Sequence, residues 1–99
     1  MPTYVLMTKL GPELAKDVQH RREIGKEWRK RVKTCCPGVK FITHYALLGA
    51  YDFLDIFEAS DAEEAAKVSM ISRAAGAISA ESWTAIPYSK FLKILDEVQ

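Results

Sequence analysis

The sequence lacks any long apolar run. Its 99 residues are 48% hydrophobic and 27% charged, which is the composition of a soluble globular protein. No segment approaches the roughly 20 apolar residues of a membrane-spanning helix. The start, Met1–Tyr4, has neither the charged region nor the apolar stretch of a signal peptide. We therefore expect one domain over residues 1–99, located in the cytoplasm and without membrane contact.

Cysteine and histidine are scarce. The two cysteines, Cys35 and Cys36, are adjacent, and neighbouring cysteines would close a strained ring if oxidised to each other. The only histidines are His20 and His44, and no metal-ligand spacing surrounds them. Phosphate-loop, dinucleotide and serine-hydrolase motifs do not occur either. We expect reduced cysteines, with a redox role as the alternative, no bound metal, and no cofactor that the sequence identifies.

The net charge is only +1, but the charges are unevenly distributed. Residues 12–34 contain eight basic and four acidic side chains, a net charge of +4. A solvated helix face is the simplest interpretation, and a polyanion site or an electrostatic dimer contact are the alternatives. The acidic residues interleave with the basic ones and no nucleic-acid-binding motif occurs, so nucleic acid is not an expected partner. The predicted buried stripe of this helix comprises Leu14, Val18, Gly25, Trp28 and Val32.

The pattern along the chain predicts four strands and three helices. β-branched and aromatic runs bounded by Gly and Pro indicate strands, and apolar or small residues at helical spacing indicate helices. The predicted elements are a strand over 3–10, a helix over 12–34, two strands within 39–59, a helix over 60–75, a strand over 78–86 and a helix over 88–98. This order predicts an α+β, ferredoxin-like βαββαβ domain with a short C-terminal helical extension over 87–99. The helix over 60–75 begins with a capping box, either Ser60 with Glu63 or Asp61 with Glu64, and Gly76 can end it.

Residues 39–59 predict a β-hairpin whose register pairs His44 with Asp55. Gly49 at the first position of a two-residue turn suits a type II′ turn and positive φ. A four-residue loop closed by Leu47 and Asp52 gives the same register. Either loop therefore places the imidazole opposite the carboxylate.

Side-chain alternation divides the hairpin into two faces. The face predicted to lie under the helices carries Phe41, Thr43, Tyr45, Leu47, Leu54 and Ile56. The other face carries Ile42, His44, Ala46, Leu48, Tyr51, Phe53, Asp55 and Phe57. Two helices cannot cover both sides of the sheet, so we expect a second subunit to cover the face with His44. Two sheets packed in this way form a dimeric α+β barrel with a cavity between them.

The hairpin turn resembles that of the GYD-domain proteins, a family of small prokaryotic proteins with a Gly, Tyr, Asp motif at this position. The segment Leu47–Asp52, the strand that follows it and the opening Pro2–Val5 carry the resemblance. The family motif corresponds to Gly49, Tyr51 and Asp52. The resemblance implies a dimeric α+β barrel and carries no settled activity or cofactor.

Two functional classes follow from these residues. The first is a small-molecule-binding homodimer, a sensor or accessory protein, whose ligand-binding residues are predicted to be Ile42, Tyr51, Asp52, Phe53, Phe57 and Trp83. The second is a monooxygenase- or isomerase-like enzyme in which Asp55 orients His44 as a general base, so that both would be catalytic. The structural alternative is that His44 and Asp55 only satisfy each other's hydrogen bonds. Asp52 can likewise serve the loop by accepting backbone hydrogen bonds.

Overall fold

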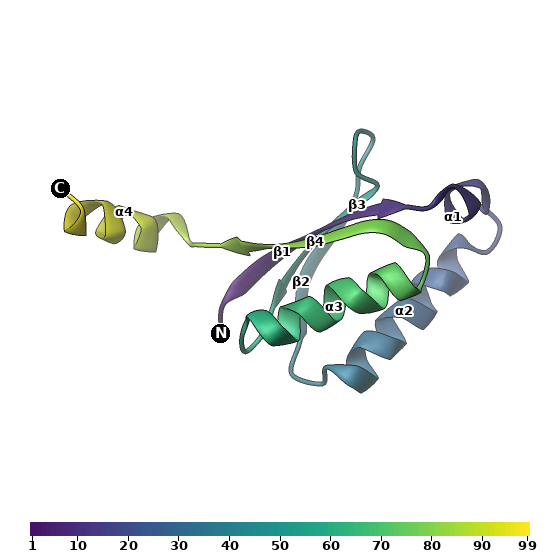
Figure 1. The fold of residues 1–99 in the computed structure, drawn as a ribbon, viewed down its shortest axis with the longest axis horizontal. Helices are drawn as coiled ribbons and strands as arrows, with labels where there is room; N and C mark the ends of the chain where they lie inside the picture. Colours follow the sequence, from purple (N-terminus) through teal and green to yellow (C-terminus); the bar gives the residue numbers. More distant parts are fainter.

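The computed structural model describes residues 1–99 as four strands and four helices built around one sheet (Figure 1). In chain order the elements are β1 (Thr3–Leu10), α1 (Pro12–Lys16), α2 (Arg21–Cys35), β2 (Lys40–Ala46), β3 (Phe53–Glu58), α3 (Ala62–Ala74), β4 (Ala77–Ala85) and α4 (Tyr88–Glu97). The strands lie in the order β2-β3-β1-β4, and every neighbouring pair is antiparallel. The predicted ferredoxin-like arrangement is therefore confirmed.

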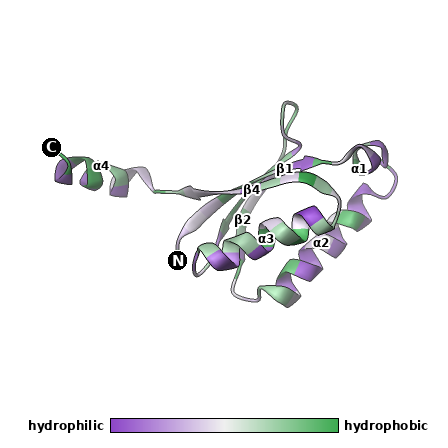
Figure 2. Ribbon diagram, in the orientation of Figure 1, coloured by the Kyte–Doolittle hydropathy of each residue, from purple (hydrophilic) through white to green (hydrophobic).

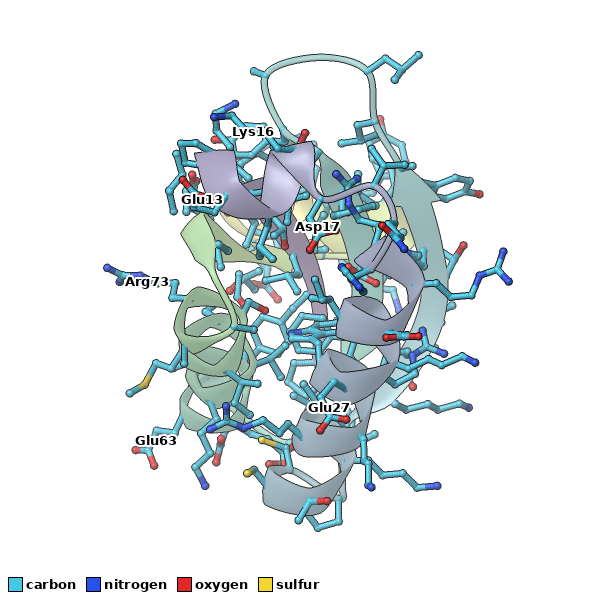
Figure 3. All side chains as sticks on the ribbon, turned by 90° about the vertical axis from the view of Figure 1, so that its right-hand side faces the viewer. Glu13, Lys16, Asp17, Glu27, Glu63 and Arg73 are labelled. Carbon is cyan, nitrogen blue, oxygen red and sulfur yellow. The ribbon has the colours of Figure 1, made fainter.

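Helices α2 and α3 cover one face of the sheet and leave the opposite face uncovered (Figure 1). The core between helices and sheet consists of Tyr4, Leu6, Val32, Cys36, Phe57, Ala59, Ala65, Val68 and Ile71. Hydrophilic residues dominate much of the remaining α2 surface (Figure 2), and on α3 the side chains of Glu63 and Arg73 point away from the core (Figure 3). Because side chains alternate along a strand, Tyr4 and Leu6 face the helices and Val5 lies on the uncovered side.

The basic helix predicted over 12–34 is interrupted between Lys16 and Arg21. In this connection the carboxylate of Asp17 accepts hydrogen bonds from the backbone N–H of His20 at 3.1 Å and from its Nδ1 at 2.9 Å. The backbone hydrogen bond from His20 lowers the pKa of Asp17. Val18, predicted in the buried stripe, is 77% exposed. The continuous helix was a wrong prediction, because a local Asp side-chain turn competes with the helical hydrogen bonds here.

Local signals fix both ends of α3 as predicted. Asp61 is the N-cap, and its side chain accepts a hydrogen bond from the backbone N–H of Glu64 at 2.9 Å. The carboxylate of Glu64 in turn accepts a hydrogen bond from the backbone N–H of Ser60 at 2.9 Å. Gly76 follows the helix with φ +114°, and a Cβ at that position would lie 2.4 Å from Leu14 Cδ1. Only glycine fits both the backbone conformation and the space at this connection.

Helix α4 extends away from the body of the protein (Figure 1). None of its residues is buried. Its large apolar side chains, which include Tyr88, Phe91 and Leu92, are between 38% and 71% exposed. The helix predicted over 88–98 is therefore present, but it presents its apolar side chains outside the domain core.

Candidate functional site

The predicted register of the hairpin between β2 and β3 is confirmed. His44 pairs with Asp55, and the backbone N–H of Leu47 donates to the carbonyl oxygen of Asp52 at 2.8 Å. The four-residue loop is therefore the alternative that the structure adopts. The prediction of positive φ at Gly49 was wrong, since Gly76 is the only residue with positive φ.

The assignment of the hairpin faces was correct for Phe41 but wrong for His44, Asp55 and Phe57, which lie on the side covered by the helices. Phe57 is fully buried and Asp55 is 2% exposed, both beneath the helices. The Phe57 ring stacks on Tyr4 with 5.6 Å between centroids, and Phe41 lies 5.3 Å from Trp28 of α2.

A register shift between Phe41 and Thr43 explains the error on β2. The strand contains one extra residue there, so Phe41 and His44 lie on the same side, although three positions separate them. Ile42, the residue at the shift, is 52% exposed. The alternation rule that divided the two faces therefore fails at this point of the strand.

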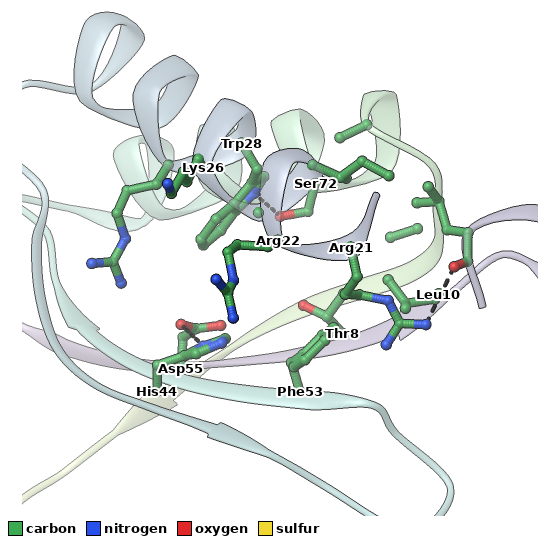
Figure 4. Close-up of a pocket in the computed structure, with 16 residues that line it drawn as sticks. Thr8, Leu10, Arg21, Arg22, Lys26, Trp28, His44, Phe53, Asp55 and Ser72 are labelled. Atoms are coloured by element: carbon green, nitrogen blue, oxygen red, sulfur yellow. Dashed lines mark hydrogen bonds and ion pairs between the residues drawn. The ribbon is translucent and has the colours of Figure 1, made fainter. Parts of the chain in front are cut away.

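The face of His44 and Asp55 forms the floor of a pocket inside one protomer, between α2 and the sheet (Figure 4). The pocket has a volume of about 480 Å³. Its floor consists of Thr8, His44, Phe53 and Asp55, its wall of Arg21, Arg22, Ile24, Gly25, Lys26, Trp28 and Arg29 from α2, and its end of Leu10, Leu14, Ser72, Ala75 and Ala77. The cavity that the sequence predicted between two subunits is therefore replaced, for His44 and Asp55, by a pocket under the protomer's own helix.

His44 and Asp55 form a close hydrogen-bonded pair at this floor. Nδ1 of His44 lies 2.5 Å from Oδ1 of Asp55, and the imidazole stacks on Phe53 with 5.4 Å between ring centroids. The His44 side chain is 46% exposed, whereas that of Asp55 is 2% exposed. Burial raises the pKa of Asp55, and the opposing effects of His44 and of the Arg29 charge are smaller. The Nε2 atom of His44 has no hydrogen-bond partner in the chain, so it is free to bind a ligand or to transfer a proton.

Cationic side chains of α2 form the opposite wall. Arg22, Lys26 and Arg29 follow one another at four- and three-residue spacing, which places them on one side of the helix. None of the three forms an ion pair with a carboxylate of this chain. The Arg22 side chain extends from α2 toward the His44–Asp55 pair (Figure 4). Arg21 is held differently, because its guanidinium donates to the carbonyl oxygens of Leu14 at 3.3 Å and Ala15 at 3.0 Å.

Trp28 fixes the side of α2 that faces the sheet. Its Nε1 donates a hydrogen bond to Oγ of Ser72 at 2.7 Å, and Ser72 donates to the carbonyl oxygen of Val68 at 3.0 Å. This chain of hydrogen bonds joins α2 to α3 across the pocket. The residues of α2 were missing from the predicted site, although the net charge of +4 and the predicted buried stripe were the sequence signals for it.

The structure distributes the other predicted site residues over separate places. Phe53 lines the pocket, whereas Phe57 belongs to the core. Asp52 accepts a hydrogen bond from the backbone N–H of Leu10 at 2.7 Å, which joins the hairpin loop to the end of β1. Asp52 therefore accepts a backbone hydrogen bond, but its donor belongs to the end of β1 and not to the hairpin loop.

Tyr51 and Trp83 meet on the other side of the sheet. The hydroxyl of Tyr51 donates to Oε2 of Glu81 at 2.8 Å, and Nε1 of Trp83 donates to Oε1 of the same carboxylate at 2.9 Å. These hydrogen bonds lower the pKa of Glu81 and raise the pKa of Tyr51. The cluster is apart from the pocket, so Tyr51 and Trp83 do not share a site with His44.

The structure contains neither a cluster of metal-binding side chains nor a disulfide bond. The structure contains no group of three or more His, Cys, Asp or Glu side chains able to hold a metal ion. Cys35 is exposed and Cys36 is buried, and both are free thiols. Burial raises the pKa of the Cys36 thiol, which disfavours its reactive thiolate form. None of the helices has the length and apolar character needed to cross a bilayer.

Comparisons with known proteins agree with this fold. A model of the GYD domain matches residues 4–95. A protein of Thermus thermophilus called "Glutamine synthetase and cystathionine beta-lyase binding protein" is 29% identical over 96 residues, an alignment covering 93% of this chain and 96% of the relative. Among solved structures, the crystal structure of FFRP-DM1 has a TM-score of 0.55 and 17% identity, and covers 87% of this chain and 100% of its own. This last similarity concerns the fold alone.

Proposed function

We propose that this chain, which belongs to the GYD-domain family, is a small-molecule-binding accessory protein. The observation that carries the proposal is the pocket of about 480 Å³ between α2 and the sheet. Pockets of about 300–1,000 Å³ with apolar walls and a few convergent polar groups are typical of sites for small organic ligands. The proposal keeps the cytoplasmic location expected from the sequence.

The relative from Thermus thermophilus supports the accessory part of the proposal. It is named for binding two enzymes, and its alignment extends over nearly the whole of both chains. We carry over only this kind of role, which is a small protein that acts by binding other proteins. Helix α4 is a suitable contact element, because its apolar side chains lie outside the core.

The proposal includes a homodimer that forms through the uncovered side of the sheet. We call this surface the open face and define it by Val5, Met7, Tyr45, Leu54, Ile56 and Trp83, which pair across the four strands. A second copy is the occupant we propose, because the same apolar rows on two sheets can pack against each other about a two-fold axis. Tyr45 and Trp83 are 58% and 46% exposed in the protomer.

Light scattering after size exclusion is expected to give about twice the protomer mass of 11.2 kDa. The physical reason is that the large apolar side chains of Tyr45 and Trp83 are exposed on this face of the protomer, and such surface is normally buried against a partner. A protomer mass at micromolar concentration would contradict the dimer. The pocket would be unaffected by that outcome, since all of its walls come from one chain.

Gly25→Leu is expected to abolish ligand binding without loss of the fold. Gly25 lines the pocket, and a Cβ built on it would meet no atom within 4 Å, so a larger side chain has space to enter the cavity. Leucine is also the better helix former by about 0.5–1 kcal/mol. Native mass spectrometry of protein purified from cells is expected to show a co-purified small molecule with the original chain and none with Gly25→Leu.

Gly25→Ala is the matched control for this experiment. It adds a single methyl group at the same position, so it should retain the ligand and raise the thermal stability slightly. Retention of the co-purified molecule by Gly25→Leu, or its absence from the original chain, would contradict the proposed pocket.

An enzyme using His44 and Asp55 is the second candidate function. The 2.5 Å contact between them, with Nε2 of His44 unpartnered, favours it, because a carboxylate that fixes one ring nitrogen leaves the other able to transfer a proton. The original chain should convert the co-purified molecule to a product if the protein is such an enzyme. The variant His44→Gln should then still bind the molecule but no longer convert it. Binding without conversion in both proteins would leave the accessory role.

A further inference from the structure

We infer that the ligand of the pocket is a small organic anion, with its carboxylate or phosphate group at Arg22, Lys26 and Arg29 and its apolar part against Trp28 and Phe53. The inference rests on the proposed function and specifies the chemical class that the same pocket selects. Four cationic side chains and His44 line this pocket, whereas Asp55 is its only acidic residue.

The three cations are available to a ligand. One guanidinium nitrogen of Arg21 donates to the carbonyl oxygens of Leu14 and Ala15. Arg22, Lys26 and Arg29 have no carboxylate partner. Arg29 lies over the Phe41 ring, with its guanidinium carbon 5.2 Å from the ring centroid, which holds it beside the pocket floor. Guanidinium groups bind carboxylates and phosphates through paired N–H donors, so this wall is suited to either anion.

The single carboxylate of the floor does not cancel this charge. Asp55 is 2% exposed, and its Oδ1 is in contact with Nδ1 of His44. The imidazole is the more exposed member of the pair, and its free Nε2 is able to donate a further hydrogen bond to an anion when the ring is protonated. An entering anion therefore meets His44 and the α2 cations before it meets Asp55.

The apolar residues of the pocket determine the chemical character of the uncharged part of the ligand. Trp28, Phe53 and Ile24 contribute aromatic and aliphatic surface to the same cavity. A bare inorganic ion would leave that surface wet, whereas an anion with an aromatic or aliphatic tail would bury it. The concave apolar surface beside these three exposed cations favours a binding site over a simple solvated basic face.

The test uses 3-phenylpropanoate and phenyl phosphate as anionic probes and 3-phenylpropanamide as the uncharged counterpart, with binding measured by isothermal titration calorimetry. We expect both anions to bind and the amide to bind at least about ten-fold more weakly, the effect of losing one charge-assisted contact. Arg22→Gln should weaken both anions about ten-fold, and Arg22→Gln combined with Lys26→Gln should weaken them further. Arg31→Gln, on the same helix but outside the pocket, is the matched control and should change nothing.

The possible outcomes separate this inference from the proposed function. Equal affinity for the amide and the anions would overturn the anionic class while retaining the pocket as a small-molecule site. An equal loss in Arg22→Gln and Arg31→Gln would also overturn it, because it would indicate attraction by the whole helix. Binding of no probe, together with no co-purified molecule in the Gly25 experiment, would overturn both proposals.

Discussion

Replacing Phe57 by alanine is expected to lower the free energy of unfolding by about 3–5 kcal/mol. The Phe57 side chain is fully buried in the core, stacked on Tyr4 and 5.9 Å from the centroid of Phe41. Its removal would leave a cavity between the sheet and α2 that the surrounding rings cannot fill. Urea-induced unfolding of Phe57→Ala, followed by tryptophan fluorescence, measures the loss.

Ile56→Ala is the matched control on the neighbouring residue of β3. Ile56 lies on the open face, opposite Val5 and Thr43, and is only half-buried in the protomer. We expect a loss of about 1 kcal/mol for the protomer, with any larger effect depending on protein concentration through the dimer. Equal losses for the two variants at all concentrations would contradict the assignment of the faces.

His44→Ala is expected to lower the free energy of unfolding by about 2–3 kcal/mol near neutral pH, because it leaves the buried Asp55 carboxylate without its partner. Burial raises the folded-state pKa of Asp55, and His44 opposes this effect, so the variant should have a still higher Asp55 pKa. A folded-state pKa above the unfolded one means that stability falls as the pH rises through the interval between them. The loss caused by the substitution should therefore grow as the pH rises above the unfolded-state pKa of an aspartate, about 3.9.

His20→Ala is the control for that prediction. His20 forms the other His–Asp contact of the chain, but there the side chains of His20 and Asp17 are 57% and 37% exposed. Exposed pairs contribute about 0–1 kcal/mol, so this variant should change little at any pH. Urea unfolding at three pH values compares the two, and a pH-independent loss in His44→Ala would contradict the role assigned to the buried carboxylate.

Local sequence signals predicted the topology and the hairpin register correctly. Alternation, Gly and Pro positions and the Asp61 cap depend on neighbouring residues, so they can be read from short segments. The His44–Asp55 pairing followed from the length of the loop alone. These successes include the contact between His44 and Asp55 at the floor of the pocket.

The same local signals could not predict which face of the sheet carries His44 and Asp55. The extra residue in β2 at Ile42 leaves no clear sequence signal, and it breaks the alternation on which the two faces were based. The break between α1 and α2 similarly depends on Asp17 competing with the helix, a competition that the composition of the segment does not decide. Neither feature follows from the spacing of apolar residues on which the predictions were based.

The two tryptophans of the chain provide the most direct test of the central claim, which is that the ligand binds between α2 and the sheet of one protomer. Trp28 lines the pocket and Trp83 lies on the open face, and each indole N–H has a single hydrogen-bond acceptor in the chain. In a ¹⁵N–¹H correlation spectrum, with Trp83→Phe used for assignment, addition of 3-phenylpropanoate should shift the Trp28 indole signal and leave that of Trp83 in place. A shift of the Trp83 signal alone would place the ligand on the open face and contradict the account.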